Sequence, residues 1–242
     1  MCKEFEREAM LLGDDAIEKL ARSRVALFGV GGVGSYAAEA LARSGVGSIL
    51  LVDNDTVSLS NINRQLCALH STVGRYKADV VAERLLDINP RLKVTVRKEF
   101  LLPENAHTFD WSSFDYVIDA IDTVSGKLAI AEGCTAAKTP MISCMGTGNK
   151  LDPTAFRVTD ISKTNTCPLA RVMRRELRAR GITHLPVIYS VEEAMTPKRI
   201  AEGDNGKRVP ASIAFVPSVA GLMAASEAVK SILGKEDING KA

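Results

Sequence analysis

A glycine run and a set of later polar residues carry the chemistry that this sequence suggests. The run is Gly29-Val30-Gly31-Gly32-Val33-Gly34, and the polar residues that follow it are Asp53, Asn61, Arg64, Lys77 and Asp122. Glycines spaced as G-x-G-x-x-G let a backbone approach nucleotide phosphates at the start of a helix. A dehydrogenase would use the glycines and Asp53 but would leave the cations and Asp122 without a role. The whole set therefore favours an ATP that is cleaved over a redox cofactor that stays intact.

The glycines of the run are expected to have different roles at a nucleotide site. Gly29 permits the tight turn, Gly31 lets the backbone approach phosphate, and Gly34 lets the helix pack closely on the strand. Gly32 is expected to join the phosphate contacts. The sequence has no G-x-x-x-x-G-K-[ST] motif, because Gly126-Lys127 is followed by leucine and lacks the upstream glycine. A P-loop ATPase is therefore excluded.

The neighbouring elements place the glycine run on a strand-to-helix turn. An apolar run precedes it, and apolar residues recur at helical spacing over residues 33–43. Strands are expected at residues 25–28, 49–52, 94–96, 116–118 and 141–143, with helices between them. This alternation predicts a Rossmann-like, doubly wound α/β fold with a mostly parallel sheet. Asp53 ends the second strand, roughly 20 residues past the glycines, where an acid usually binds ribose hydroxyls.

The remaining polar residues follow the same elements. Arg64 comes shortly after the second strand, and Lys77 opens a helix with apolar periodicity. Acids at the carboxyl end of a parallel strand face the ligand crevice, so Asp122 is expected to hold Mg²⁺ against a triphosphate. Asp119, inside the strand end, is expected to be structural.

Each of these residues also has a simpler interpretation. Arg64 could be a surface charge, and Lys77 could be an ordinary solvated lysine. Asn61 could be a helix N-cap, with or without a role at the phosphates. Asp122 could cap a helix that begins near Ser125.

The complete pattern resembles the E1-like superfamily of adenylating enzymes, the ThiF/MoeB type that serves thiamine and molybdopterin synthesis. The matching features are G-V-G-G-V-G, the acid at the end of the second strand, N-I-N-R-Q at 61–65, the lysine of the next helix and D-x-x-D at 119–122. The resemblance implies that Asp53 binds ribose and that Asp122 binds Mg²⁺. It also implies that Asn61, Arg64 and Lys77 contact the triphosphate of ATP.

The same resemblance implies a homodimer in which Arg7 reaches into the site of the neighbouring subunit. The residues beside Arg7 depart from the usual aromatic-and-arginine pattern of the family.

Within the superfamily, the chain is most similar to the tRNA threonylcarbamoyladenosine dehydratases, over nearly its whole length. The supporting stretches are residues 32–45, D-I-N-P at 87–90, residues 151–164 and P-L-A at 168–170. The chain departs from the family at Cys167, where an Asp commonly precedes the P-L-A. The resemblance implies that ATP activates the threonine carboxylate of a modified adenosine in tRNA as an acyl adenylate. A nitrogen of the same side chain then closes a ring, with net loss of water.

Three other functions remain open from the residues alone. Adenylation of the C-terminus of a small ubiquitin-like sulfur-carrier protein would use the same ATP residues. An NAD-dependent oxidoreductase would explain only the glycines and Asp53, and a silent partner subunit would not need the full set. The cysteines are Cys2, Cys67, Cys134, Cys144 and Cys167, and no two form C-x-x-C. A four-thiolate zinc site is therefore not expected. Cys144 and Cys167 could each be a nucleophile or a small buried residue.

A tRNA substrate should leave a basic surface. The formal net charge is only +2, so such a surface must come from clustering. Residues 169–181 form a helix by pattern, whose arginines Arg171, Arg174, Arg175 and Arg178 are candidates for phosphate contacts. Residues 196–208 are expected to form a flexible basic loop. The alternative for the helix is a solvated amphipathic face.

The length of 242 residues suits one E1-like ATP-binding domain. We expect an N-terminal helical segment at 1–23, a nucleotide-binding core at 24–150, and a substrate-side extension with a closing helix at 151–242. The apolar stretch 213–233 contains Pro217 and Glu227, which predicts a short strand and a packed helix rather than a membrane span. Irregularly spaced cysteines and the lack of a secretory signal predict a cytoplasmic protein without integral membrane association. A sulfur-relay or redox accessory protein is left open as a further partner.

Overall fold

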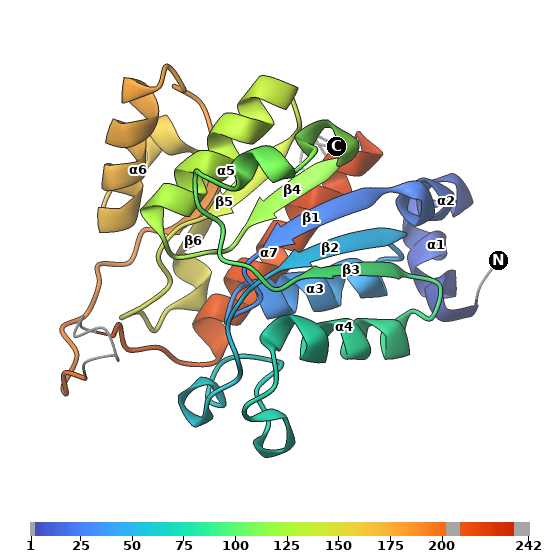
Figure 1. Ribbon diagram of the computed structural model, residues 1–242, viewed down its shortest axis with the longest axis horizontal. Coiled ribbons are helices and arrows are strands. Elements are labelled where there is room, and N and C mark those ends of the chain that lie inside the picture. Colours follow the sequence, from blue (N-terminus) through green and yellow to red (C-terminus); the bar gives the residue numbers. More distant parts are fainter. Residues whose placement is uncertain (1–2, 202–208, 235–242) are drawn as a thin grey trace.

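The centre of the protein is a seven-stranded sheet with the strand order β3-β2-β1-β4-β5-β7-β6 (Figure 1). The structure is a computed structural model and describes residues 3–201 and 209–234. The strands are β1 (Arg24–Phe28), β2 (Ser48–Val52), β3 (Lys93–Arg97), β4 (Tyr116–Asp119), β5 (Met141–Cys144), β6 (Phe156–Asp160) and β7 (Pro186–Ser190). All neighbouring strands pair in parallel except β6, which runs antiparallel to β7 at the edge. The predicted Rossmann-like, mostly parallel α/β fold is confirmed.

Helices cover both faces of this sheet. They are α1 (Glu6–Leu12), α2 (Asp14–Arg22), α3 (Gly34–Arg43), α4 (Lys77–Ile88), α5 (Val124–Ala137), α6 (Pro168–Ala179) and α7 (Phe215–Leu233). Short 3₁₀ turns lie at Lys3–Phe5, Leu59–Asn61, His70–Thr72, Ala106–Thr108, Trp111–Ser113, Pro153–Ala155 and Ile161–Lys163. One apolar core joins α2, α3, α4 and α7 to the sheet, and a second core joins α5 and α6 to the other face.

The alternation of side chains along the strands explains why there are two cores. In β1, Val25 and Leu27 belong to the first core, whereas Ala26 and Phe28 belong to the second. Successive residues of a strand point to opposite faces, so a strand that is apolar throughout needs cover on both sides. The buried pattern of β1 thus requires helices on each face of the sheet.

The order of the strands locates the edge at which a ligand can bind. The chain runs from β1 to β2 and β3 on one side, and then returns to β4 on the other side of β1. Ligands of open α/β sheets bind beyond the carboxyl ends of the strands at such a switch point. The turn after β1 and the loop after β4 therefore meet at the candidate site.

Two parts of the fold differ from the sequence-based expectations. β6 and β7 were not among the predicted strands, because they lie in the region where the regular alternation ends. The short strand expected near Ile213 is absent from the described structure, and α7 instead begins at Phe215. Pro217 does not prevent this, because a proline in the first turn of a helix removes no intrahelical hydrogen bond.

The last helix is a core element. By length and composition α7 could cross a membrane, with a hydropathy of 1.2 over its most apolar window. Its residues Ala220, Ala224 and Ala228 are nevertheless fully buried in the first core. At Gly221 an added Cβ would stand 2.2 Å from the carbonyl oxygen of Val33, so α7 and the start of α3 touch through their backbones. Such packing is typical of a helix that completes a protein core.

Candidate nucleotide-binding site

The glycine turn after β1 forms the first wall of the site. Gly29 has φ +84° and an added Cβ there would lie 2.8 Å from the carbonyl oxygen of Ala120. At Gly34 an added Cβ would lie 1.7 Å from the carbonyl oxygen of Gly29. Gly31 differs, because its nearest neighbour would be the Gln65 side chain at 3.6 Å. Packing thus requires Gly29 and Gly34, whereas space beside Gly31 remains for a ligand.

Asp53 connects this turn to the end of β2. Its Oδ2 accepts a hydrogen bond from the Val30 amide at 2.8 Å, and its Oδ1 accepts one from the Asp55 amide at 2.8 Å. Burial raises the pKa of the Asp53 carboxyl, while these hydrogen bonds and the charge of Lys77 act in the opposite direction. Each carboxylate oxygen retains a lone pair for a further donor, as a ribose hydroxyl would be.

Lys77 is the cation of the site that is most enclosed. It is the first residue of α4 and is only 6 % exposed, so the interpretation as a solvated lysine is wrong. Its Nζ donates to Asp55 Oδ2 at 2.7 Å, and its backbone N donates to the Asp55 carbonyl at 2.9 Å. The side chain of Asp55 is itself 61 % exposed. The partner of this enclosed ammonium group is therefore a largely exposed carboxylate.

Arg64 and Asn61 lie in the turn that follows β2. Arg64 Nη1 donates to the Ser60 carbonyl at 2.8 Å and to Asn63 Oδ1 at 2.9 Å. An added Cβ at Gly32 would lie 3.7 Å from Arg64 Cγ, so the arginine lies beside the glycine turn. Half burial lowers the pKa of its guanidinium, and the residue is not a plain surface charge. Asn61 is not an N-cap, because it is the third residue of the 3₁₀ turn. Its Oδ1 accepts a hydrogen bond from the Ser58 amide at 3.1 Å.

Asp122 is exposed and makes no hydrogen bond or ion pair with the residues that the structure describes. The alternative that it caps α5 is wrong, because the N-cap residue is Thr123. Asp122 lies in the loop between β4 and α5, and Ile121 of the same loop would contact a Cβ on Gly29 at 3.0 Å. The structure therefore places a free carboxylate in the loop that packs on the glycine turn.

A buried ionic cluster lies directly beneath that loop. Lys127 and Asp119 are fully buried, and Lys127 Nζ donates to Asp119 Oδ2 at 3.0 Å. From the sequence, Lys127 is only part of a Gly-Lys pair that does not complete a P-loop motif, and no role is predicted for it. The signal that could have found it is a lysine within the apolar run of α5, together with the acid at the end of β4.

The segment before α7 and the first turn of α7 also reach the site, which the sequence did not predict. Asn63 Nδ2 donates to the Ser212 carbonyl at 3.0 Å. An added Cβ at Gly32 would lie 3.2 Å from Pro217. Asn149 lies in the loop after β5, and its amide donates to the Ala211 carbonyl at 2.7 Å. The Ala211 amide in turn donates to Asn149 Oδ1 at 2.8 Å. Residues 209–217 thus join the loop after β5 to the nucleotide edge.

Arg7 is not at this edge in the same chain. It is exposed on α1, which lies with α2 at the amino ends of the strands (Figure 1). Phe5, just before α1, would contact a Cβ on Gly45 at 3.6 Å, and Gly45 precedes β2. Arg7 can therefore meet an ATP site only in another subunit.

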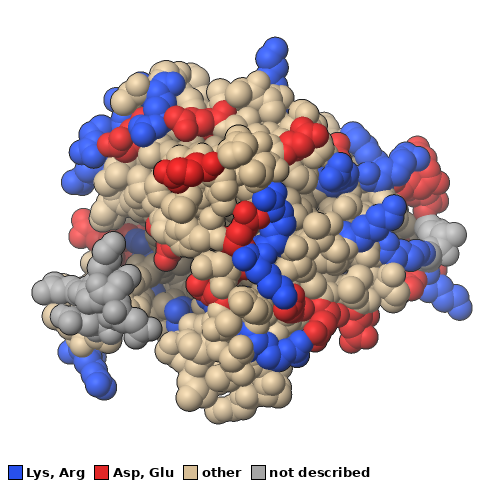
Figure 2. All heavy atoms as spheres, in the orientation of Figure 1, with Lys and Arg blue, Asp and Glu red and all other residues tan. Residues whose placement is uncertain are grey.

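The arginines of α6 fall into three groups. Figure 2 shows basic side chains over the corner that α6 forms, with acidic ones among them. Arg174 is used within the fold, since its Nη1 donates to the Thr164 carbonyl at 2.8 Å. Arg175 pairs with Glu176 at 2.7 Å. Arg171 and Arg178 are exposed and have no partner among the described residues, so these two are free to meet phosphates. In the loop at 196–208, Lys198 and Arg199 are exposed, whereas residues 202–208 lie outside the described residues.

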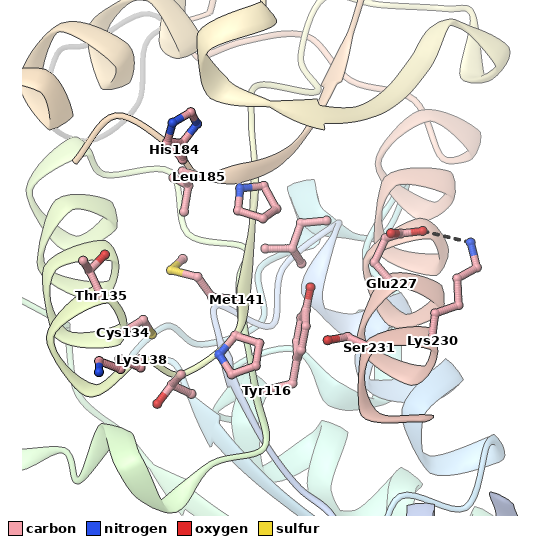
Figure 3. A pocket seen from close by; sticks show the side chains of 14 residues that line it. Tyr116, Cys134, Thr135, Lys138, Met141, His184, Leu185, Glu227, Lys230 and Ser231 are labelled. Atoms are coloured by element: carbon pink, nitrogen blue, oxygen red, sulfur yellow. Dashed lines mark hydrogen bonds and ion pairs between the residues drawn. The ribbon is translucent and has the colours of Figure 1, made fainter. Parts of the chain in front are cut away.

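A cavity of about 410 Å³ lies at the opposite edge of the sheet. The first residues of three strands, Tyr116, Met141 and Pro186, line it together with Lys138 and Lys230 (Figure 3). The glycine turn and Asp122 follow the carboxyl ends of the strands, so this cavity is separate from the candidate site.

Two kinds of group could be held at the candidate site, a nucleotide and a divalent cation. Within residues 3–201 and 209–234, no three His, Cys, Asp or Glu side chains are grouped to hold a metal. Mg²⁺ commonly binds through one or two carboxylates, with phosphates and waters as its other ligands. A free Asp122 beside the glycine turn fits that mode.

Comparison with known proteins shows the family to which the chain belongs. The chain matches the ThiF family over residues 5–242. It is 46% identical over 243 residues to a tRNA threonylcarbamoyladenosine dehydratase of Bacillus subtilis, with 96% of each chain covered. The crystal structure of the Escherichia coli tRNA N6-threonylcarbamoyladenosine dehydratase in complex with ATP has a TM-score of 0.88 at 36% identity, covering 98% of this chain and 97% of that one. The complex of the E. coli enzyme with AMP has a TM-score of 0.87 at 37% identity and covers 96% and 95%.

Proposed function

We infer that this chain, which belongs to the ThiF family, is an ATP-dependent adenylating enzyme that dehydrates N6-threonylcarbamoyladenosine in tRNA. The observation that carries this inference is 46% identity over 96% of both chains to a protein of that name. A match of this extent includes the substrate side as well as the nucleotide edge. A sulfur-carrier adenylating enzyme would need to share only the nucleotide edge.

The reaction converts a poor electrophile into a good one. The threonine carboxylate of the modified adenosine attacks the α-phosphorus of ATP, and the bond to pyrophosphate breaks. A nitrogen of the same side chain then attacks the acyl carbon, loses its proton and expels AMP. ATP becomes AMP and pyrophosphate, and the nucleoside has lost one water. Because the second nucleophile is already beside the acyl carbon, proximity takes the place of a catalytic thiol.

The buried cysteines support a mechanism without a thiol nucleophile. Burial raises the pKa of Cys144 to about 12 and that of Cys67 to about 11. A thiolate is the reactive form of cysteine, and these two groups are protonated at neutral pH. Cys167 is also buried, at the N-cap of α6. The chain's own chemistry then consists of aligning two anions and neutralising charge.

The proposed roles of the site residues follow from their positions. Asp53 binds the ribose through the free lone pairs of its carboxylate. Asn61, Arg64 and Lys77 contact the triphosphate, with amides of the turn at Gly31, Gly32 and Gly34 at the N-terminus of α3 supplying further donors. Gly29 shapes the turn, because its own amide donates to the Val52 carbonyl at 2.8 Å. Arg64 and Lys77 offset the charge that develops at the phosphates during attack. Mg²⁺, when bound at Asp122, supplies further positive charge at the phosphates.

A homodimer is proposed as the functional unit. The location of Arg7 at the amino edge of the sheet supports this, because the residue can assist ATP only across a subunit boundary. An accessory sulfur-relay or redox protein is proposed as a further partner. The free thiols at Cys67, Cys134, Cys144 and Cys167 persist in a reducing compartment, which supports a cytoplasmic location.

The tRNA surface is proposed to include α6. Arg171 and Arg178 are its best-supported contacts, because their side chains are exposed and have no partner within the described part of the chain. Arg175 would have to leave Glu176, and Arg174 would have to leave Thr164. Arginines that contact phosphates contribute affinity without reading the sequence of the nucleic acid.

Incubation of the purified protein with modified tRNA, ATP and Mg²⁺ tests the function directly. Nucleoside mass analysis should show the loss of one water from N6-threonylcarbamoyladenosine, with AMP and pyrophosphate formed in equal amounts. Unmodified tRNA is the matched control and should release neither product. If the nucleoside mass stays unchanged while a carrier protein ending in Gly-Gly supports pyrophosphate exchange, the alternative adenylation reaction is correct.

A further inference from the structure

We propose that Lys127 is a positioning residue that holds the Asp122 loop and the loop after β5 in register at the ATP site. This role rests on the proposed function. Lys127 is fully buried, so its side chain touches neither ATP nor tRNA.

Lys127 is bonded through its side chain to the loop that carries Asp122. Its backbone N makes only the ordinary helical hydrogen bond to the carbonyl of Thr123, the N-cap of α5, at 3.0 Å. Its Nζ donates to Asp119 Oδ2 at 3.0 Å, while Asp119 Oδ1 accepts from the Ile121 amide at 3.2 Å. The ammonium group of Lys127 therefore holds the carboxylate that fixes the residue before Asp122, while the Asp122 side chain has no hydrogen-bond or ion-pair partner among the described residues.

The same ammonium group reaches the neighbouring strand. Lys127 Nζ donates to the Cys144 carbonyl at 2.7 Å and to Ser143 Oγ at 3.4 Å, and Ser143 Oγ donates to Asp119 Oδ2 at 2.5 Å. An ammonium has three donors, and each has a partner here. The cluster thus joins the carboxyl ends of β4 and β5, from which the Asp122 loop and the loop after β5 depart.

The cluster also lies behind the glycine turn. Ala120, between its members, donates to the Phe28 carbonyl at 2.8 Å. The Ala120 carbonyl lies 2.8 Å from where a Cβ on Gly29 would stand. A shift of the Asp119 backbone would therefore displace Asp122 relative to the phosphates.

Stability alone does not explain a charged pair in this position. Lys127, Asp119 and Ser143 are all fully buried, and buried ion pairs can often be replaced by apolar residues without loss of stability. A fully satisfied buried network does fix one arrangement of the chain. Beneath a loop that carries the exposed carboxylate of Asp122, that fixed arrangement serves the placement of Asp122.

Calorimetric titration with ATP, in the presence and absence of Mg²⁺, tests this role. Four variants are compared with the wild type: Lys127→Met, the double variant Asp119→Asn with Lys127→Met, Asp122→Ala, and Leu20→Ala. Leu20 is fully buried in α2, away from the site, and reports the effect of lost core packing alone. The double variant leaves no unpaired buried charge, so it keeps the test valid if Lys127→Met fails to fold.

The expected result is a selective loss of the Mg²⁺ effect. Without Mg²⁺, the double variant should bind ATP within about twofold of wild type. In the double variant, the gain in ATP affinity on adding Mg²⁺ should fall by roughly 10- to 100-fold, as is common when a residue that positions a metal ligand is replaced. Leu20→Ala should keep the full gain. If Asp122→Ala loses the gain but the double variant keeps it, the role of Lys127 is overturned. If wild type and Asp122→Ala respond equally to Mg²⁺, the proposed metal site itself is wrong.

Discussion

Two glycine-to-alanine substitutions in one turn should have opposite consequences. Gly31→Ala places a methyl group 3.6 Å from the Gln65 side chain, an ordinary contact distance. Gly34→Ala places one 1.7 Å from the Gly29 carbonyl oxygen. The first variant should fold and lose nucleotide binding, whereas the second should lose stability. The contrast tests the assignment of Gly31 to phosphate and Gly34 to packing.

The magnitudes follow from these contacts. Gly31 does not have a positive φ, so alanine there should change the free energy of unfolding by less than about 1 kcal/mol. If its methyl group displaces a phosphate from one backbone N–H, binding weakens by about 1.5–3 kcal/mol, or roughly 10- to 150-fold in Kd. At Gly34 the backbone must shift by about 1 Å, which should cost about 3 kcal/mol or more.

Urea unfolding and ATP titration on the same samples separate the two effects. Gly31→Ala should keep the denaturation midpoint of wild type and show the weaker Kd, while Gly34→Ala should show a lower midpoint. The reasoning is refuted if Gly31→Ala binds ATP as tightly as wild type, or if both variants are destabilised to the same extent.

The other predictions concern catalysis, tRNA and the buried thiols. Arg64→Ala should lower the rate of pyrophosphate release by roughly 10²–10³-fold, because one preorganised cation is lost from the transition state; stopped-time product assays measure it. Arg171→Ala combined with Arg178→Ala should weaken tRNA binding and reduce the salt slope of log K by about 2, measured by filter binding at several salt concentrations. Because burial raises the pKa of Cys144 to about 12, its thiol should resist iodoacetamide at pH 8 in the folded protein and react after unfolding, as peptide mass analysis would show.

Each of these predictions has its own control. Arg64→Lys keeps the charge without the planar guanidinium and should fall between wild type and alanine; a wild-type rate for Arg64→Ala would reject its role. Arg174→Ala should lower the melting temperature through Thr164, and an unchanged salt slope in the Arg171 and Arg178 double variant would place the tRNA surface elsewhere. Alkylation of native Cys144 as fast as in urea would contradict its burial.

The parallel core of the fold could be predicted because its strands are short apolar runs between helical patterns. The expected strand at 25–28 is β1, with one further residue at its start, and the other four predicted strands differ from the structure by one or two residues. β7 could not be predicted in the same way, because it follows an irregular stretch and begins with Pro186. β6 pairs only at the sheet edge, where Arg157 and Val158 are exposed, so it lacks a buried apolar run. The division at 24–150 and 151–242 remains a prediction.

The site could be predicted where residues sit in a continuous motif. The structure brings Gly31, Asp53, Arg64 and Lys77 to one edge of the sheet, because each either follows a strand that ends there or opens a helix that begins there. Their roles toward ATP stay predictions. The contact of Asn149 with Ala211 could not be foreseen, since it joins loops far apart in the chain. Tertiary packing alone creates such a contact.

The contact between α7 and the glycine turn sets an order of events during synthesis. Pro217 and Gly221 support Gly32 and Val33 from behind, and they are synthesised after β1 to β5. A nascent chain can form β1 to β5 early, but its phosphate-binding wall stays without backing until α7 emerges. ATP should therefore stabilise only a chain that includes α7, and a chain truncated before Phe215 should gain no resistance to unfolding from the nucleotide that stabilises the chain with α7.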